Sequence, residues 1–350
     1  MATIAPVAIT AHPERAAVST NISATIPQLD ALRFGCFVLV FMVHNLPSDA
    51  SRYPFLGEVF GLIASAGRFG VDVFFALSAY LITKRVIRER EKGGLNIPRF
   101  YRDRAIRILP LLWGFLALVY ALGSAGVIPK TDDSVVLLTA IGLGNFALLG
   151  GSAASMSIMP LWSVAVEKQF YAAWPWLTRA VAIRKLAIAM LALSFAARFV
   201  VGEQTSWGLT FTRLDPLALG ALLATISMPT AKWAPLIGTG ACGLIVAEMM
   251  RTSILWPVSY SIAAVASVAL IIGAHNAPRP DRISAYLGRI SYGLYVFHGL
   301  SMVLVGSVII HGSQASYLGT VVVKLAITII LASASYHFFE TRFLRHHCVR

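Results

Sequence analysis

The sequence contains few charged residues and especially few acidic ones. Only 13% of its 350 residues are Asp, Glu, Lys or Arg, whereas 57% are hydrophobic. A soluble domain typically has about 25% charged residues and about 45 to 50% apolar ones, so this composition excludes a chain that folds around one water-exposed core. Apolar runs of about 17 to 22 residues recur from residue 29 onward, each long enough to cross a bilayer as a helix. The lipid bilayer is therefore the expected environment.

Cysteine is scarce as well. The three cysteines, Cys36, Cys242 and Cys348, show neither a pairing pattern nor metal-ligand spacing, so we expect no disulfide framework and no metal site. Residues 1–27 lack a basic start followed by an apolar core, which indicates that no signal peptide is cleaved and that the first apolar run directs insertion.

The chain also lacks a Pro- or Ser-rich linker, a low-complexity tract and a clear internal repeat. We therefore expect one membrane domain at residues 29–343. A disordered cytoplasmic tail is expected at residues 1–28, and a basic cytoplasmic tail at 344–350, with no soluble domain after it.

Ten apolar runs predict an all-α, polytopic transmembrane bundle of about ten spans. A further apolar stretch, Ser134 to Gly150, would invert every later loop as an eleventh span, and it contains Gly142, Gly144 and Asn145. We interpret it as a re-entrant or peripheral segment, which is tolerated where protein covers its backbone. The ten expected spans are 29–46, 67–83, 108–128, 160–178, 184–201, 213–228, 233–250, 255–273, 287–311 and 319–340.

Lys and Arg are distributed unequally between the two sides of this topology. Twenty of the 29 basic residues fall in segments on one side, nine of them between Lys84 and Arg107, and only four fall on the other. The basic side is predicted to be cytoplasmic, which places both termini inside. The formal net charge of +13 is thereby explained as a topology signal, so no nucleic-acid partner is expected.

The first apolar run carries two ionisable residues, Arg33 and His44, eleven positions apart. On an α-helix this spacing places both on nearly the same face, about 16 Å apart along the axis. Ionisable residues within spans are rare and usually functional, although an interfacial histidine is the alternative for His44. We expect Arg33 near the cytoplasmic end of the span and His44 near the outer end.

The loop before the third span prefers arginine to lysine. Seven of its nine basic residues are arginines, and three of them, Arg102, Arg104 and Arg107, stand in FYRDRAIRILP, where the chain re-enters the membrane. Cytoplasmic anchoring explains the charge but not the preference for arginine. A planar guanidinium binds phosphate through two parallel hydrogen bonds, so these arginines are candidate ligands for a phosphorylated cytoplasmic donor.

The fourth expected span begins with LWSVAVEKQFY and brings four polar residues together, namely Ser163, Glu167, Lys168 and Gln169. Such a cluster at membrane depth is costly and usually lines a cavity or reaction site. The alternative is that Glu167 and Lys168 pair with neighbouring groups for packing alone.

The predicted topology places further candidates in the outer layer of the membrane, near His44. They are Asp72 of GVDVFFALSAYLITK and Asp215 of RLDPLALG. A histidine beside carboxylates is a natural general base for a hydroxyl nucleophile. His298 of LGRISYGLYVFHG stands in mid-span, where a buried core histidine is the first interpretation and a direct catalytic role is the alternative.

Six ordered blocks of the sequence resemble the acyltransferase-3 family of bacterial membrane acyltransferases. The similarity runs from about Leu29 to Phe343. The family includes O-antigen, exopolysaccharide and nodulation-factor acetyltransferases and macrolide acylases, so the resemblance implies an enzyme of the bacterial cytoplasmic (inner) membrane. The blocks are LDALR with a His eleven residues after its Arg, GVDVFFALSAYLIT, FYRDRAIRILP, LWSVAVEKQFY, RLDPLALGALL, and LGRISYGLYVFH followed by SYHFFE.

The resemblance also implies which residues act. In this family the arginine and histidine of the first span are regarded as essential, and the arginines after the second span are implicated as well. These positions correspond to Arg33, His44, Arg104 and Arg107 in this sequence. The same reasoning makes three residues of the fourth span further candidates, namely Ser163, Glu167 and Gln169.

Two positions depart from the family pattern. The usual Glu-Glu-Gln reads Glu167-Lys168-Gln169, which changes the local charge by two units and leaves the pairing of Glu167 open. The usual glycine after the serine of the second-span block is Ala79.

Residue patterns and resemblance together predict an O-acyltransferase whose donor substrate is a cytoplasmic acyl-CoA, most simply acetyl-CoA. Its phosphates would contact Arg33, Arg104 and Arg107, and His44 would deprotonate a hydroxyl group of a carbohydrate or glycolipid acceptor. Asp72 or Glu167 would orient the imidazole.

Two alternatives stay open at this point. Transfer can proceed through a covalent acyl-enzyme on Ser78, Ser163 or His44 itself. A secondary transporter would also have about ten spans and polar residues at the midplane, although it would show inverted repeats. The sequence does not specify the acceptor, the acyl chain length or the oligomeric state.

Overall fold

The computed structural model describes residues 26–46, 57–306 and 314–345, and these residues form helices and no β-strand. The expected all-α architecture is confirmed. Most of the two expected tails, at 1–28 and 344–350, lies outside the described residues. The first part of the chain contains α1 (Pro27–Asn45), α2 (Gly57–Ala66), the 3-10 turn η2 (Gly67–Phe69), α3 (Gly70–Glu91), α4 (Ile97–Ser124), α5 (Asp133–Ile141), α6 (Gly144–Leu149), η3 (Met159–Leu161) and α7 (Trp162–Ala180). The second part contains α8 (Ile183–Val201), α9 (Glu203–Ser206), η4 (Thr210–Arg213), α10 (Leu214–Ala224), α11 (Trp233–Arg251), α12 (Trp256–Asn276), α13 (Arg282–Arg289), α14 (Ser291–Gly306), α15 (Gln314–Ser335), the π-helical turn η5 (Tyr336–Glu340) and α16 (Thr341–Arg345).

Six helical segments of the described residues are long and apolar enough to cross a membrane. The other expected spans are also helical, but α7 and α8 each carry three charged residues, α10 has eleven residues and α14 has sixteen. The coarser prediction of a polytopic helical membrane protein therefore stands, whereas the count of about ten spans is not confirmed. The six segments are Pro27–Asn45, Gly61–Glu91, Ile97–Ser124, Trp233–Arg251, Trp256–Asn276 and Leu318–Leu344.

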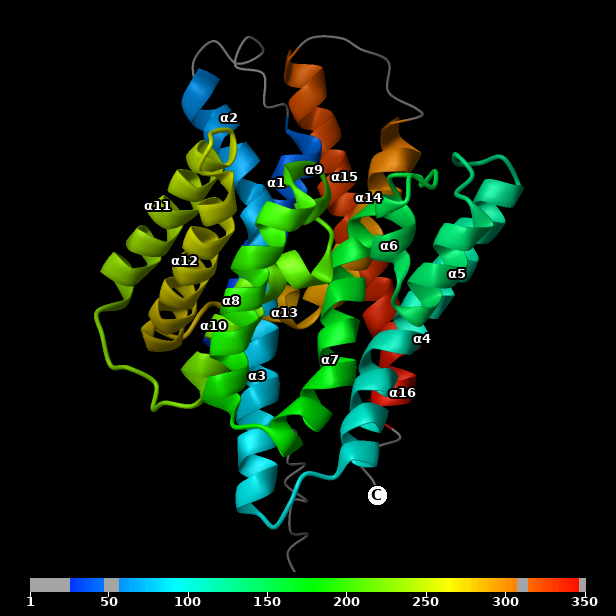
Figure 1. Ribbon diagram of the computed structural model, residues 1–350. Helices are drawn as coiled ribbons and strands as arrows, with labels where there is room; N and C mark the ends of the chain where they lie inside the picture. The colour runs from blue at the N-terminus through cyan, green and yellow to red at the C-terminus, as the bar shows by residue number, and fades with distance from the viewer. Residues whose placement is uncertain (1–25, 47–56, 307–313, 346–350) are drawn as a thin grey trace, which may run out of the picture.

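The helices run up and down in one bundle, so that successive connections alternate between its two ends (Figure 1). The connections between α3 and α4, between α7 and α8, and between α10 and α11 lie at the lower end in this view, and the α11–α12 turn lies at the upper end. The loops richest in Lys and Arg therefore share one end of the molecule. That this end faces the cytoplasm is a prediction from the charge distribution.

The boundary between α3 and α4 follows from local sequence. α3 continues past the expected end of its span to Glu91, because the intervening residues are mostly good helix formers. Gly93 and Gly94 then adopt positive φ angles of 109° and 137° and turn the chain. Asn96 starts α4 by accepting a hydrogen bond from the backbone N–H of Arg99 at 2.9 Å.

The apolar stretch 134–150 forms α5 and α6, two helices of nine and six residues. At 1.5 Å per residue neither can cross a hydrocarbon layer of about 30 Å. Gly142 lies between them with a φ of 88°, which ends α5 in a left-handed turn. The arrangement agrees with the expected re-entrant or peripheral segment.

Close packing of α3 against α10 forms the centre of the bundle. A Cβ placed on Gly220 of α10 would lie 2.0 Å from the carbonyl oxygen of Ala76 in α3, so only glycine permits this approach. Small residues at such contacts are typical of helices packed in membranes, where close backbone approach supplies much of the attraction. This packing fixes the position of α3, which contributes residues to both polar regions described below.

Candidate active site

A cavity of about 110 Å³ lies between α1, α3, α4, α7 and α14. Four of the residues that line it are ionisable groups expected at the site: Arg33, Arg104, Arg107 and Glu167. Three arginines and one glutamate give its wall an excess of two positive charges. Six hydroxyl-bearing side chains also line it, those of Ser78, Ser163, Tyr171, Ser291, Tyr292 and Tyr295.

The arginines differ in how their charge is matched. Arg33 Nη1 lies 2.5 Å from Oδ1 of Asp30, one turn earlier in α1, and this ion pair fixes the guanidinium against the cavity. Arg104 is partly buried and its Nε has no hydrogen-bond partner. Arg107 is exposed, so the cavity approaches the surface of the protein beside it.

Glu167 does not neutralise the arginines through a direct ion pair. Its Oε1 accepts a hydrogen bond from the hydroxyl of Tyr171, one turn along α7. The Tyr171 ring in turn lies under the Arg104 guanidinium, 5.9 Å from ring centroid to Cζ. An unpaired guanidinium N–H and a surplus of positive charge are the features that bind an anion in a partly desolvated site.

Ser163 lies deep in the cavity wall, but no base contacts it. Its Oγ is 2.6 Å from the hydroxyl of Tyr295, and both groups are bonded to the carbonyl oxygen of Pro160. A nucleophilic serine requires a neighbouring group that can accept its proton, and a phenol with its own carbonyl partner is a poor one. This geometry favours a positioning role for Ser163 over a covalent one.

His44 lies beyond this wall and packs against a second histidine. Its Nδ1 is 3.3 Å from Nε2 of His298, with ring centroids 5.3 Å apart. His298 is completely buried, and its Nδ1 is 2.6 Å from the carbonyl oxygen of Tyr295. Since Tyr295 lines the cavity, the chain Tyr295–His298–His44 connects the arginine cavity to the expected general base, although His44 itself does not line the cavity.

Asp72, considered above as a partner of His44, instead binds Arg213, whose Nη2 lies 2.8 Å from Oδ2 of the aspartate. Asp215 is bonded to Arg198 of α8 and accepts a hydrogen bond from Ser261 of α12 at 2.7 Å. All four charged groups are at most 4% exposed. The two aspartates therefore belong to a separate buried network of ion pairs, which we call the ion-pair network (Arg198, Arg213, Asp72 and Asp215).

Two other candidates, Gln169 and Arg102, lie outside the cavity lining. Gln169 donates hydrogen bonds to the Gly142 carbonyl oxygen at 2.8 Å and to Asn145 at 2.9 Å, so it holds the α5–α6 turn against α7. The neighbouring Lys168, which departs from the family pattern, donates to the Ala140 carbonyl at the C-terminus of α5 at 3.1 Å. Arg102 is exposed and lies 3.5 Å from Asp103.

Sequence reasoning gave no role to several residues that shape this region. Arg198 and Arg213 lie within expected spans, and because a charge buried in a membrane requires a partner, their position is a signal that predicts pairing with aspartates. Tyr171 and Tyr295 stand three or four residues from Glu167 and His298. That helical spacing places each pair on one face and is the signal that identifies them.

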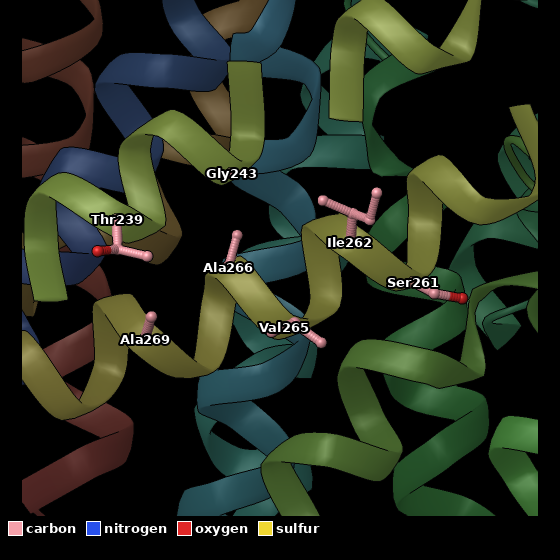
Figure 2. Close-up of a pocket in the computed structure, with 7 residues that line it drawn as sticks. All are labelled: Thr239, Gly243, Ser261, Ile262, Val265, Ala266 and Ala269. Carbon is pink, nitrogen blue, oxygen red and sulfur yellow. The ribbon is translucent and has the colours of Figure 1, made fainter. Parts of the chain in front are cut away.

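A second hollow, of about 300 Å³, lies between α11 and α12 (Figure 2). Small and apolar side chains form its wall, including Gly243, Val265 and Ala266, and it contains no ionisable residue. In the part of the chain that the structure describes, no group of three His, Cys, Asp or Glu residues could hold a metal ion. The arginine cavity with its adjoining histidine pair is therefore the candidate active site.

Comparison with known proteins agrees with the resemblance. The family model for an acyltransferase domain, acyltransferase-3, matches residues 26–337. A Staphylococcus aureus protein (strain COL) that is provisionally named an O-acetyltransferase is 25% identical, over 91% of this chain and 57% of its own length. The O-acetyltransferase OatA of S. aureus (strain NCTC 8325 / PS 47) is 24% identical, over 79% of this chain and 52% of its own.

The chain spans about half the length of these curated relatives. No solved structure matches it. The family match nevertheless covers almost every helix of the bundle, including all the elements that form the arginine cavity. The chain therefore belongs to the acyltransferase-3 family of membrane acyltransferases.

Proposed function

We propose that this protein is a membrane-embedded O-acyltransferase that moves an acetyl group from cytoplasmic acetyl-CoA to a hydroxyl group of a carbohydrate or glycolipid. Family membership and the names of the relatives support O-acetyl transfer, and the carbohydrate acceptor is supported by the resemblance to polysaccharide-modifying enzymes. The proposal places the protein in the bacterial inner membrane with both termini in the cytoplasm.

One observation supports this function most directly: an arginine-lined cavity adjoins a pair of histidines, of which His298 is buried and His44 is partly buried. The cavity contains Arg33, Arg104 and Arg107, and a surplus of one positive charge remains after Glu167 and the Arg33–Asp30 ion pair are counted. Acetyl-CoA carries several phosphate groups at one end and a thioester at the end of a long flexible arm. A volume of about 110 Å³ cannot hold the whole molecule, so the nucleotide must extend outward past the exposed Arg107.

Access of the thioester to His44 requires a movement of Tyr295. The Tyr295 side chain lines the cavity and is hydrogen-bonded to Ser163 and to the Pro160 carbonyl. The backbone carbonyl of Tyr295 is hydrogen-bonded to His298 of the histidine pair. Rotation of this side chain breaks two hydrogen bonds and extends the cavity toward His298. The incoming pantetheine arm is the group that takes its place.

In the transfer step His44 removes the proton from the acceptor hydroxyl, whose oxygen attacks the carbonyl carbon of the thioester. A carbon–oxygen ester bond forms as the carbon–sulfur bond breaks. Coenzyme A leaves as a thiolate and receives the proton from the His44 imidazolium, so the enzyme returns to its starting state. A covalent route through Ser163 is disfavoured, because among the described residues no base contacts its hydroxyl group.

The test is release of free coenzyme A from acetyl-CoA by inverted membrane vesicles that contain the protein. The acceptor is supplied as the total polysaccharide and glycolipid fraction of the host, and acetyl groups from radiolabelled acetyl-CoA are followed into that fraction. We expect thiol release and labelled acceptor in equal amounts. A transporter would move its substrate chemically unchanged, and labelled acetyl-CoA taken up intact would contradict the proposal.

A further inference from the structure

His298 is held in one orientation and one protonation pattern by its surroundings. Its Nδ1 lies 2.6 Å from the backbone carbonyl oxygen of Tyr295, and a carbonyl oxygen can only accept a hydrogen bond. Nδ1 therefore carries a proton. The ring is completely buried and packs edge-on against Phe37, with centroids 6.2 Å apart. An imidazolium ion at this place would lose its hydration without gaining a carboxylate, so the neutral ring is favoured.

The neutral ring has consequences for His44. With the proton on Nδ1, Nε2 of His298 has a lone pair and can only accept a hydrogen bond. The atom 3.3 Å from it is Nδ1 of His44, which must then be the donor. The proton of neutral His44 is thereby placed on Nδ1, which leaves the lone pair on Nε2.

We propose that His298 is the positioning residue of the reaction, selecting the tautomer of His44 that has its basic nitrogen on Nε2. This inference rests on the proposed function, because it assigns a task to His298 through the general base. When His44 takes the acceptor proton on Nε2, it becomes an imidazolium whose Nδ1–H still donates to His298. His298 accepts that hydrogen bond throughout and exchanges no proton with the substrates.

The opposite arrangement would be inactive. If Nε2 of His298 carried a proton, it would donate to Nδ1 of His44, and the remaining proton of neutral His44 would lie on Nε2. That nitrogen could then not receive the acceptor proton. A residue that only fills space at position 298 would remove the acceptor that favours this tautomer of His44, and the productive fraction would fall.

Three substitutions of His298 distinguish the effect of losing its hydrogen bond to His44 from the effect of losing its packing. In His298→Gln the side-chain amide reaches the position of Nε2, where its oxygen can accept from His44. In His298→Asn the shorter amide reaches only the position of Nδ1, so it can donate to the Tyr295 carbonyl but cannot reach His44. His298→Leu fills the site without either bond.

The experiment measures kcat and the KM for acetyl-CoA of each variant, using coenzyme A release in vesicles and thermal unfolding in detergent. We expect His298→Leu and His298→Asn to lower kcat by about 100-fold or more, because a general base contributes a factor of about this size. The KM for acetyl-CoA should stay within about twofold of the wild-type value. His298→Gln should keep kcat within about tenfold of wild type. If Asn is as active as Gln, or if all three variants match wild type, the proposal is overturned.

Two further measurements distinguish a failure of this inference from a folding defect and from a failure of the proposed function. If His298→Leu fails to fold, the Gln and Asn pair still decides the question. In a His44→Ala background, His298→Leu should change the residual rate by less than about twofold, because two residues that act as one unit are not additive. If the wild-type protein releases no coenzyme A, the proposed function fails, whereas an active wild type that is insensitive to His298 overturns this inference alone.

Discussion

Arginines gather in two regions of this protein, and their charges are matched differently. In the ion-pair network, Arg198 and Arg213 are bonded to Asp215 and Asp72, so the buried charges cancel. In the arginine cavity, three arginines share a wall with one glutamate, and that glutamate is bonded to a tyrosine rather than to a guanidinium.

The difference separates a structural use of buried charge from a binding use. Charges that are removed from water need a partner, and in the network the protein itself supplies one. The cavity retains surplus positive charge, which an anionic ligand can balance, whereas among the described residues an unpaired guanidinium Nε occurs in both regions, on Arg104 and on Arg213. Substitutions in the network should therefore change stability, and substitutions around the cavity should change kinetics.

The largest expected effect is at the general base. His44→Ala should lower kcat by about 10²- to 10⁴-fold, because the acceptor hydroxyl loses the group that takes its proton. The unfolding temperature in detergent should stay close to that of wild type, since His44 is only partly buried. Coenzyme A release measures the first quantity, and wild-type activity in this variant would exclude His44 as the base.

The next effect concerns stability. Arg198→Met should cost about 3 to 5 kcal/mol of folding free energy, because it leaves the buried Asp215 without its cation. Thermal unfolding in detergent measures the loss, and the double variant Arg198→Met with Asp215→Leu should regain most of it. If the single variant is as stable as wild type but acyl transfer is impaired, the ion-pair network takes part in the reaction, and the contrast between a structural and a binding region is wrong.

A smaller effect is expected in the cavity wall. Arg104→Ala should raise the KM for acetyl-CoA by about 10- to 100-fold, corresponding to the roughly 1.5 to 3 kcal/mol of a hydrogen bond to a charged group. The matched control is Arg99→Ala, an exposed arginine at the start of the same helix, which should leave the KM unchanged. An unchanged KM with a slower kcat for Arg104→Ala would contradict phosphate binding.

The smallest effect tests the departure from the family pattern. Lys168→Ala should cost about 0.3 to 1 kcal/mol, because the ammonium group binds the Ala140 carbonyl at the C-terminus of α5, where a positive charge is favourable. The KM for acetyl-CoA should not change, since Lys168 does not line the cavity. A large kinetic effect would show that the α5–α6 segment takes part in the reaction.

Much of the fold could be predicted because hydrophobic runs and charge asymmetry are local signals. The helices corresponding to the expected spans are all present, but α10, expected at 213–228, covers only Leu214–Ala224. The helix begins one residue later than expected, directly after η4, and ends four residues earlier, at Ala224. The sequence also could not show how Arg213 and Asp215 near its start are paired, because their partners come from α3 and α8.

The candidate site was predicted in part for the same reason. Arg33 lies in the cavity wall, with Arg104 and Arg107. Asp72 was assigned to the wrong neighbour, since its pairing with Arg213 joins residues 141 positions apart, and one sequence contains no signal for such a pairing. The contact of His298 with His44 likewise spans 254 positions, which is why a core histidine was the first interpretation.

Helix α3 touches three charged clusters along its length. Asp72 joins the ion-pair network, Ser78 lines the cavity, and Arg85 lies 2.7 Å from Asp103 of α4 below it. A helix of 22 residues is stiff over its length of about 33 Å, so a tilt at its lower end displaces the upper end as a lever does. Any separation of α3 from α4 at the Arg85–Asp103 ion pair is thus transmitted to the opposite end of α3, where Asp72 joins the ion-pair network.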